Sequence, residues 1–287
     1  NCQRDCTVGF AMEIPPEGVK FLLSGGSAGA AQSGLDGGRT GIVKLKSRKP
    51  TAGHFMKLFH QLHFNLCSKV MTVHQPLCLR SDRFADLRVT MAQTGHIDSG
   101  GKIDICISAI ENRTSGEKSV IVDPVMADSG KLYAGFNSYV DAMKKLCKKA
   151  DIITPNYTEA CLLSEIPYNE FPTEEEINKC FKNLAAIGAK SAVITGIKTT
   201  KKTIKTVYSD FSESEYFEMS YNYINEMLHG GGDVFSAVLC GKILEGASRK
   251  QAVKTASNFT NACIINTKTK NQYGLNFEPL LRDIKKY

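Results

Sequence analysis

Short β-branched runs alternate with longer amphipathic segments along the last two thirds of the chain. Each run ends in polar, Pro or Gly residues, as is typical of a buried parallel strand and the loop that leaves its carboxyl end. Strands that alternate with helices predict an α/β fold with a mostly parallel, doubly wound sheet. The expected strands are 119–125, 151–153 and 191–195, and the expected helices are 102–112, 137–149, 158–164 and 174–187.

The end of the chain follows a different pattern. Segments 203–209 and 214–219 alternate apolar and polar residues, which predicts a β-hairpin. Helices are expected over 233–245, 249–266 and 278–285. Thr173, with Glu176 three residues later, predicts a capping box at the start of the helix 174–187. Since no repeat, low-complexity tract or linker interrupts the pattern, residues 1–287 are expected to form a single domain.

Composition narrows the class of protein. The 287 residues contain no apolar run near the roughly 18 residues that a membrane span needs. The net charge of +7 suits an anionic nucleotide, and no basic stripe with interleaved aromatic residues suggests nucleic acid. The ten cysteines form no Cys-x-x-Cys pair, which favours free thiols in a reducing cytoplasm. No leader with a charged and then an apolar region is visible at the start.

The stretch from Leu228 to Leu239 has the strongest chemical signal. Gly230, Gly231 and Gly232 precede Asp233, which opens an apolar run with helical spacing. Glycines allow close approach of an anion, and the N–H groups and dipole of a helix start attract it. A carboxylate there can take the proton of a hydroxyl group that attacks a phosphoryl group. The alternative is that Asp233 is only the N-cap of a helix.

Polar residues also follow the predicted strands. Asp123 ends one strand, Asn156 and Glu159 follow the next, and Thr195 with Gly196 ends the third. In open α/β sheets the carboxyl edge of the strands binds the ligand. The spacing of Asn156 and Glu159 puts both on one side of a turn, where they can hold Mg²⁺ through water. The alternatives are a turn cap for Asp123 and a simple helix start at 154–156.

These motifs, in this order, resemble the ribokinase-like superfamily and, within it, the pyridoxal (vitamin B6) kinases. The resemblance runs from about Gly95 to Glu278, and residues 1–90 match the family poorly. The residues that carry it are Asp123-Pro-Val-Met, Thr154-Pro-Asn-x-x-Glu-Ala, the glycine-rich turn before Asp233, Gly130-Lys-Leu-Tyr133 and Tyr273-Gly-x-Asn-Phe-Glu278.

The resemblance implies a three-layer ribokinase-like fold and ATP-dependent phosphorylation of the 5′-hydroxymethyl group of pyridoxal, pyridoxine or pyridoxamine. Asp233 would be the catalytic base, and Gly230, Gly231 and Gly232 would form the anion hole. Asn156, Thr195 and Gly196 would contact the phosphates of ATP, and Asp123 and Glu159 would lie at Mg²⁺. The resemblance leaves open whether a monovalent cation also binds.

On the substrate side, the resemblance aligns His96 with a position that contacts the pyridine ring, and Tyr133 lies in a loop that acts as a flap. His96 could equally be a solvated loop residue. His60-x-x-His63-x-x-x-Cys67 could share a helical face, but no established zinc pattern supports a metal there. The family implies a homodimer with small-molecule partners only.

Two other functions stay open. The related hydroxymethylpyrimidine kinases share the Asp-Pro-Val-Met and Thr-Pro-Asn-x-x-Glu segments, although that group commonly has Cys where Asp233 stands. A degenerate relative that binds a vitamer or nucleotide without turnover would fit the poorly matched residues 1–90. A substrate panel would distinguish a B6 kinase from a hydroxymethylpyrimidine kinase. ADP release measured with and without pyridoxal would distinguish an active kinase from a non-catalytic relative.

Overall fold

The structure is a computed structural model of the chain. The residues that it describes are 9–13, 19–24, 41–45, 89–94, 100–111, 119–133, 139–213, 215–224, 228–267 and 274–287.

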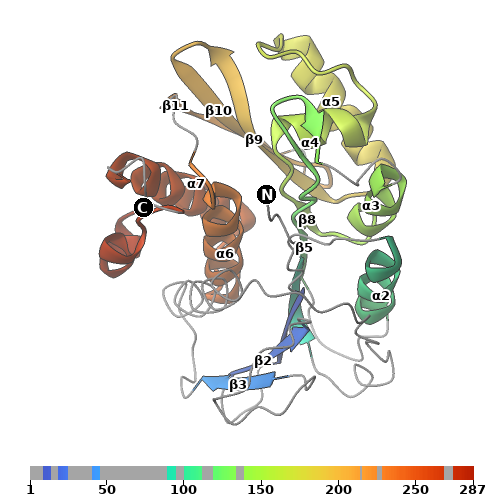
Figure 1. Ribbon diagram of the computed structural model, residues 1–287, viewed down its shortest axis with the longest axis vertical. Helices are drawn as coiled ribbons and strands as arrows, with labels where there is room; N and C mark the ends of the chain where they lie inside the picture. Colours follow the sequence, from blue (N-terminus) through green and yellow to red (C-terminus); the bar gives the residue numbers. More distant parts are fainter. Residues whose placement is uncertain are drawn as a thin grey trace, which may run out of the picture.

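A nine-stranded sheet forms the centre of the molecule, with the strand order β11-β10-β9-β8-β5-β4-β1-β2-β3 (Figure 1). Its middle strands β4, β5, β8 and β9 are parallel, and the strands on either side of them pair antiparallel. A separate two-stranded ribbon, β6–β7, leaves the carboxyl end of β5. The strands are β1 (Gly9–Glu13), β2 (Val19–Ser24), β3 (Gly41–Leu45), β4 (Val89–Thr94), β5 (Ser119–Val122), β6 (Ala127–Asp128), β7 (Lys131–Leu132), β8 (Ile152–Ile153), β9 (Ser191–Thr200), β10 (Thr203–Asp210) and β11 (Glu215–Asn222).

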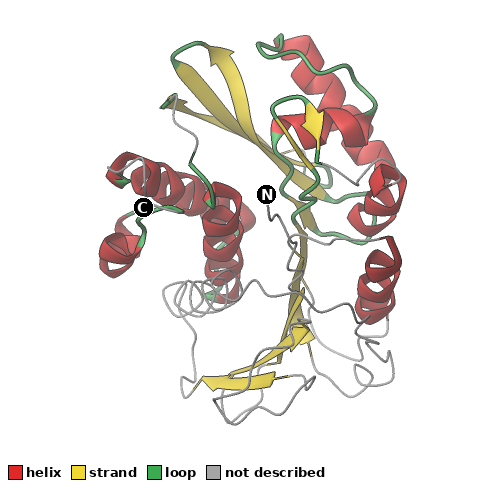
Figure 2. Cartoon of the chain, in the orientation of Figure 1, coloured by secondary structure: helices red, strands yellow, loops and turns green. Residues whose placement is uncertain are grey.

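Helices cover both faces of this sheet, which gives three layers (Figures 1 and 2). Helices α2 to α5 lie on one side, and α6, α7 and the final 3-10 helix η2 lie on the other. The predicted α/β fold is therefore confirmed. The helices are α2 (Gly100–Glu111), α3 (Tyr139–Cys147), α4 (Tyr157–Ser164), α5 (Glu174–Ile187), α6 (Gly231–Leu244), α7 (Arg249–Asn266) and η2 (Glu278–Lys286).

Alternation along the central strands builds a separate core on each face. In β5, Val120 and Val122 pack with α2 to α5, whereas Ile121 between them packs with α6 and α7. In β9, Ile194 belongs to the first core and Val193 to the second. Successive side chains of a strand point to opposite faces, so a continuous apolar run is what a sheet covered on both faces requires.

Most predicted elements agree with the structure, and three differ. The strand expected over 119–125 ends at Val122, one residue before Asp123 and Pro124. The capping box of α5 is present, because Thr173 Oγ1 accepts from Glu176 N and Glu176 Oε2 accepts from Thr173 N. Strand β9 does not end at residue 195 but runs on to Thr200, because it pairs with β10 beyond a bulge. The last segment is a 3-10 helix rather than an α-helix.

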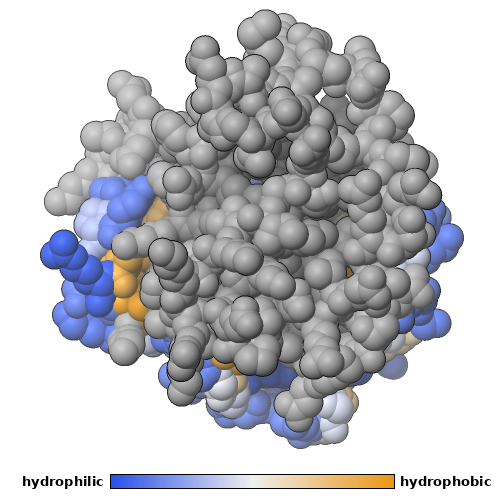
Figure 3. Space-filling view, turned by 90° about the horizontal axis from the view of Figure 1, so that it is seen from below, coloured by the Kyte–Doolittle hydropathy of each residue, from blue (hydrophilic) through white to orange (hydrophobic). Residues whose placement is uncertain are grey.

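On the face that Figure 3 shows, the visible described side chains are mostly hydrophilic, with small hydrophobic areas at the left rim and at the lower edge. No helix among the described residues is long and apolar enough to cross a membrane. The described cysteines all lie in helices as free thiols, as the sequence predicts, and all but Cys106 are buried.

Candidate active site

The N-terminus of α6 presents the predicted glycines and Asp233 at one end of the helix. Gly230 is the N-cap, with a left-handed backbone at φ 90°, and Val234 N donates to its carbonyl oxygen over 3.0 Å. Asp233 is the third helical residue, so the alternative that it caps the helix is wrong. A glycine N-cap has no side chain to bind the first-turn N–H groups, which point out of the helix end. This end therefore has the geometry and partial positive charge of an anion site.

Asp123 faces this helix end from the carboxyl end of β5. Its Oδ2 accepts a hydrogen bond of 3.0 Å from Ser236 Oγ on α6. A Cβ atom added to Gly232 would lie 3.8 Å from the same oxygen, so the glycine turn packs beside the carboxylate. The strand end and the helix start, far apart in sequence, thus form one site.

Burial and a second carboxylate perturb Asp123. Its side chain is 6% exposed, and burial, together with the negative charge of Asp233, raises its pKa to about 7. The hydroxyl groups of Ser236 and Thr154 offset part of this rise. Thr154 Oγ1 is buried beside the carboxylate without a hydrogen bond of normal geometry among the described residues. A buried carboxylate whose pKa is raised by burial and by a second carboxylate is typical of a functional site.

Asn156 and Glu159 form a capping box at the start of α4. Asn156 Oδ1 accepts from Glu159 N, and Glu159 Oε2 accepts from Asn156 N, both over 2.9 Å. The other oxygen of Glu159 accepts from Met126 N at 3.0 Å and from Ala127 N at 3.4 Å. The helix-start interpretation is therefore confirmed, and Glu159 also fixes the segment after Asp123. Burial first, then Asp123, raises the pKa of Glu159, while these N–H donors lower it.

Thr195 and Gly196 lie next to this capping box, but they do not end their strand. Thr195 N donates to Pro155 O over 3.0 Å, and Asn156 forms a parallel bridge with Thr195. The register of β9 against β10 shifts here, and Gly196 has a φ of 72°, as a bulge requires. Gly196 is exposed and Thr195 is half-buried. The bulge brings both residues to the edge that Asn156 occupies.

Tyr133 follows the ribbon β6–β7 and lies near the acidic residues. Burial, then the charges of Asp128, Glu159 and Asp123, raises its pKa to about 12. Its backbone N–H donates to Met126 O over 2.9 Å, and its side chain is 42% exposed. The predicted substrate contact therefore lies at the accessible rim of the site.

Hydrogen bonds with the start of α4 hold the ribbon β6–β7 in place. Asn156 Nδ2 donates to Ala127 O over 2.8 Å, and Gly130 N donates to Thr158 Oγ1 over 3.0 Å. Gly130 has a φ of 78°, and a Cβ atom there would come within 2.8 Å of the Tyr168 ring. The ribbon is thus a wall of the site that is bound to α4 at several points.

The other predicted ligands lie outside the described residues. His96 and the cluster of His60, His63 and Cys67 fall in this group. Among the residues that the structure describes, no group of three or more His, Cys, Asp or Glu side chains could hold a metal ion. Mg²⁺ is usually held by one or two carboxylates together with substrate phosphates and water, and Asp123 could supply such a carboxylate.

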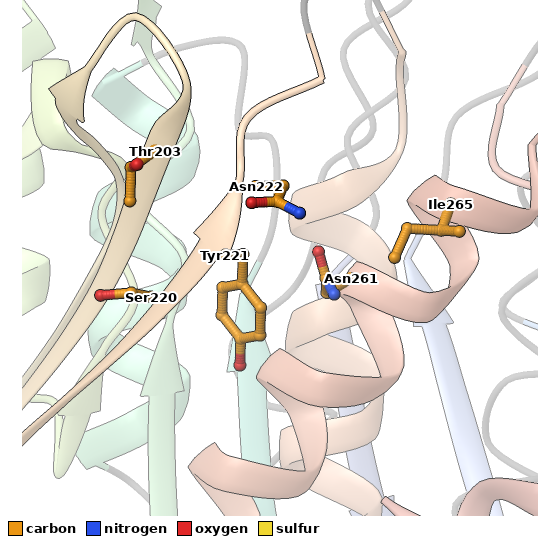
Figure 4. Close-up of a pocket in the computed structure, with 6 residues that line it drawn as sticks. All are labelled: Thr203, Ser220, Tyr221, Asn222, Asn261 and Ile265. Atoms are coloured by element: carbon orange, nitrogen blue, oxygen red, sulfur yellow. The ribbon is translucent and has the colours of Figure 1, made fainter.

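Two further features of the site region were not predicted from the sequence. Ser236 is a buried hydroxyl in a helix face that is otherwise apolar, and this break in the pattern is a signal that could have indicated it. The other is a hollow of about 330 Å³ between the hairpin β10–β11 and α7 (Figure 4). It is lined by polar and apolar groups of Thr203, Ser220, Tyr221, Asn222, Asn261 and Ile265.

Comparison with known proteins places this arrangement in a family. The family model described as phosphomethylpyrimidine kinase matches residues 80–277. A pyridoxine kinase of Bacillus subtilis is 30% identical over 192 residues, which cover 64% of this chain and 67% of the relative. A hydroxymethylpyrimidine/phosphomethylpyrimidine kinase of Haemophilus influenzae is 27% identical over 62% of this chain and 66% of the relative. The chain thus spans about two thirds of the length of these relatives.

Solved structures agree in fold. The pyridoxal kinase of Lactobacillus plantarum superimposes with a TM-score of 0.61 at 24% identity, covering 90% of this chain and 81% of that one. A Bacillus subtilis pyridoxal kinase, solved as an ADP complex, has a TM-score of 0.55 at 28% identity over 64% of this chain and 67% of that one.

Proposed function

This chain belongs to the phosphomethylpyrimidine kinase family of ribokinase-like enzymes, and we propose that it phosphorylates the 5′-hydroxymethyl group of a B6 vitamer with ATP. The observation that supports this most is the meeting of Asp233, at a glycine-capped helix start, with Asp123 at the end of β5. The pyridoxine and pyridoxal kinases among its relatives support the substrate class.

In this mechanism Asp233 accepts the proton of the primary alcohol while that oxygen forms a bond to the γ-phosphorus. The bond between the γ-phosphorus and the bridging oxygen breaks, and ADP leaves. The N–H groups at the start of α6 stabilise charge on the transferred group. Mg²⁺, when bound with the nucleotide, neutralises phosphate charge. Asp123 would hold this ion, while Glu159 would fix the segment after Asp123 through the backbone N–H groups that it accepts from. Asn156, Thr195 and Gly196 would line the path of the phosphates.

We further propose that the nucleotide base occupies the hollow between β10–β11 and α7. Asn222 and Asn261 offer amide groups, which can both donate to and accept from a planar base, and Ile265 gives an apolar surface (Figure 4). Asn222 precedes Gly230 by only eight residues in the sequence, so base and phosphates would be bound by residues that are close along the chain. Asn261→Ala should raise the KM for ATP several-fold and leave the KM for the vitamer unchanged.

Asp233→Asn is the variant that tests the chemistry. An amide cannot take the hydroxyl proton but keeps the shape, so kcat should fall by about 10²–10⁴-fold while ATP binding persists. ADP release should be measured with pyridoxal, pyridoxine, pyridoxamine and hydroxymethylpyrimidine as acceptors. Retention of more than roughly a tenth of kcat would exclude Asp233 as the base.

The second candidate is hydroxymethylpyrimidine phosphorylation, which the family description and the Haemophilus influenzae relative favour. The carboxylate at position 233 argues against it, because that group resembles this chain elsewhere but commonly has Cys there. Turnover of hydroxymethylpyrimidine that exceeds turnover of every B6 vitamer would reverse the assignment. Binding of vitamer and ATP without ADP release would instead identify a non-catalytic relative.

Assembly and location are also proposals. Twofold pairing is the commonest closed arrangement of soluble homo-oligomers and agrees with the family resemblance, so we expect a homodimer. Buried free thiols favour a reducing cytoplasm. We expect small molecules as partners, without a nucleic acid or a membrane. Light scattering that gives the mass of one chain at micromolar concentration would contradict the dimer.

A further inference from the structure

Ser236 interrupts an otherwise apolar run of α6. The neighbouring buried residues are Val234, Phe235, Ala237 and Val238, and Ser236 itself is 1% exposed. A hydroxyl group at such a position costs free energy unless it is bonded, because it gives up water. Packing alone would favour alanine here.

The hydroxyl group does not bond to its own helix. Serine and threonine inside helices commonly donate to the carbonyl oxygen four residues earlier. Ser164 does so in α4, where its Oγ donates to Ala160 O. Ser236 Oγ instead donates to Asp123 Oδ2 over 3.0 Å, across 113 residues of sequence. The bond therefore joins two layers of the fold, namely the sheet and the helix that starts the anion site.

Its position within α6 matters for the reaction. Ser236 comes three residues after Asp233, so both lie on one side of the helix. The bond therefore fixes where Asp233 and the turn of Gly230–Gly232 lie relative to Asp123. The two carboxylates repel one another, and Gly232 packs beside the same oxygen that Ser236 binds. The hydroxyl group of Ser236, which donates to Asp123 Oδ2, offsets part of the repulsion between Asp123 and Asp233 where the end of β5 meets the start of α6.

We propose that Ser236 is a positioning residue, which holds Asp123 and the Asp233 turn at the separation that a metal-bound nucleotide requires. The inference rests on the proposed kinase function and deepens it. Ser236 does not touch the substrate. It acts through Asp123, and its effect should therefore appear on the nucleotide and metal side and not on the vitamer side.

The test compares Ser236→Ala with Ser236→Thr, which keeps the hydroxyl group, and with Ser236→Cys if threonine does not fit. Ser164→Ala is the matched control, since it removes a buried helical hydroxyl that bonds to carbonyl oxygens of α4 and to Cys180 of α5 but to neither Asp123 nor α6. Binding of Mn²⁺ with ADP is measured by calorimetry, beside kcat, both KM values and the half-saturating Mg²⁺ concentration. Thermal unfolding shows that each variant is folded.

For Ser236→Ala we expect the affinity for Mn²⁺ with ADP to fall about tenfold or more and kcat to fall with it, since bonds to charged groups are among the stronger ones. The KM for the vitamer should stay within about twofold of the wild type, because the bond acts on the nucleotide side and not on vitamer binding. Threonine should restore most of the lost affinity and cysteine only a part of it, because a thiol is a weak donor. Ser164→Ala should match the wild type.

Unchanged Mn²⁺–ADP affinity in Ser236→Ala would overturn the proposal. Equal losses in the alanine variant and in the hydroxyl-retaining variant would overturn it too, because they would indicate packing alone. If the wild type binds Mn²⁺ with ADP but phosphorylates no acceptor, the proposed function fails. The calorimetric comparison still tests Ser236 in that case.

Discussion

Replacing Asp123 by asparagine should stabilise the folded chain at alkaline pH, although it removes a residue of the proposed metal site. Asp123 is 6% exposed and faces the charge of Asp233. Its neutral form is therefore favoured in the folded state, where its pKa is about 7, compared with an ordinary value of 3.8. Asparagine keeps an oxygen that can accept from Ser236 and has no charge to bury.

The magnitude follows from linkage. Between the unfolded pKa and the folded pKa, the folded state holds a proton that the unfolded state has released, so this group's contribution to stability is lost as the pH rises through that window. One pKa unit corresponds to about 1.4 kcal/mol. Ionising Asp123 in the folded chain at pH 8 thus costs of the order of 4 kcal/mol, and less than half of this cost is present at pH 5.

The assay is urea unfolding of wild type and Asp123→Asn at several pH values from 5 to 8, without nucleotide or divalent ions. The gain in the free energy of unfolding should be larger at pH 8 than at pH 5 by about 2–3 kcal/mol. Asp104→Asn, at an exposed position of α2, is the control and should show no such trend. A gain for Asp123→Asn that stays the same within about 0.5 kcal/mol across this range would refute the reasoning.

Three further results are expected. Asp233→Asn should also reduce the pH dependence of Asp123→Asn stabilisation, since one repelling charge is gone; an unchanged pH profile would mean that the two carboxylates do not interact. Glu159→Ala should lower the free energy of unfolding by about 3–5 kcal/mol in urea titrations, because it leaves three backbone N–H groups without their acceptor; a loss below about 1 kcal/mol would contradict that role. Gly130→Ala should destabilise more than Gly246→Ala in thermal unfolding, because both have positive φ but only Gly130 meets the Tyr168 ring; equal losses would exclude that contact.

The sequence by itself determined the order and type of the central elements. β-branched runs between amphipathic segments indicate buried strands and covering helices, because the periods of 2 and 3.6 are local properties of the backbone. The capping box at Thr173 is equally local, and so is the glycine-rich turn before Asp233. These features could be predicted because each depends on residues within a few positions of one another.

Tertiary structure decided what depends on pairing between distant residues. Strand β9 continues past Thr195 because β10 offers it partners across a bulge, and no signal within 191–195 indicates this. Glu159 suited a metal role by its spacing, but its oxygens are taken by N–H groups of Asn156, Met126 and Ala127, two of which lie more than thirty residues away. The link between Ser236 and Asp123 spans 113 residues. Such contacts form only when the sheet brings strand ends and helix starts to one edge, so the sequence could suggest the members of the site but not their partners.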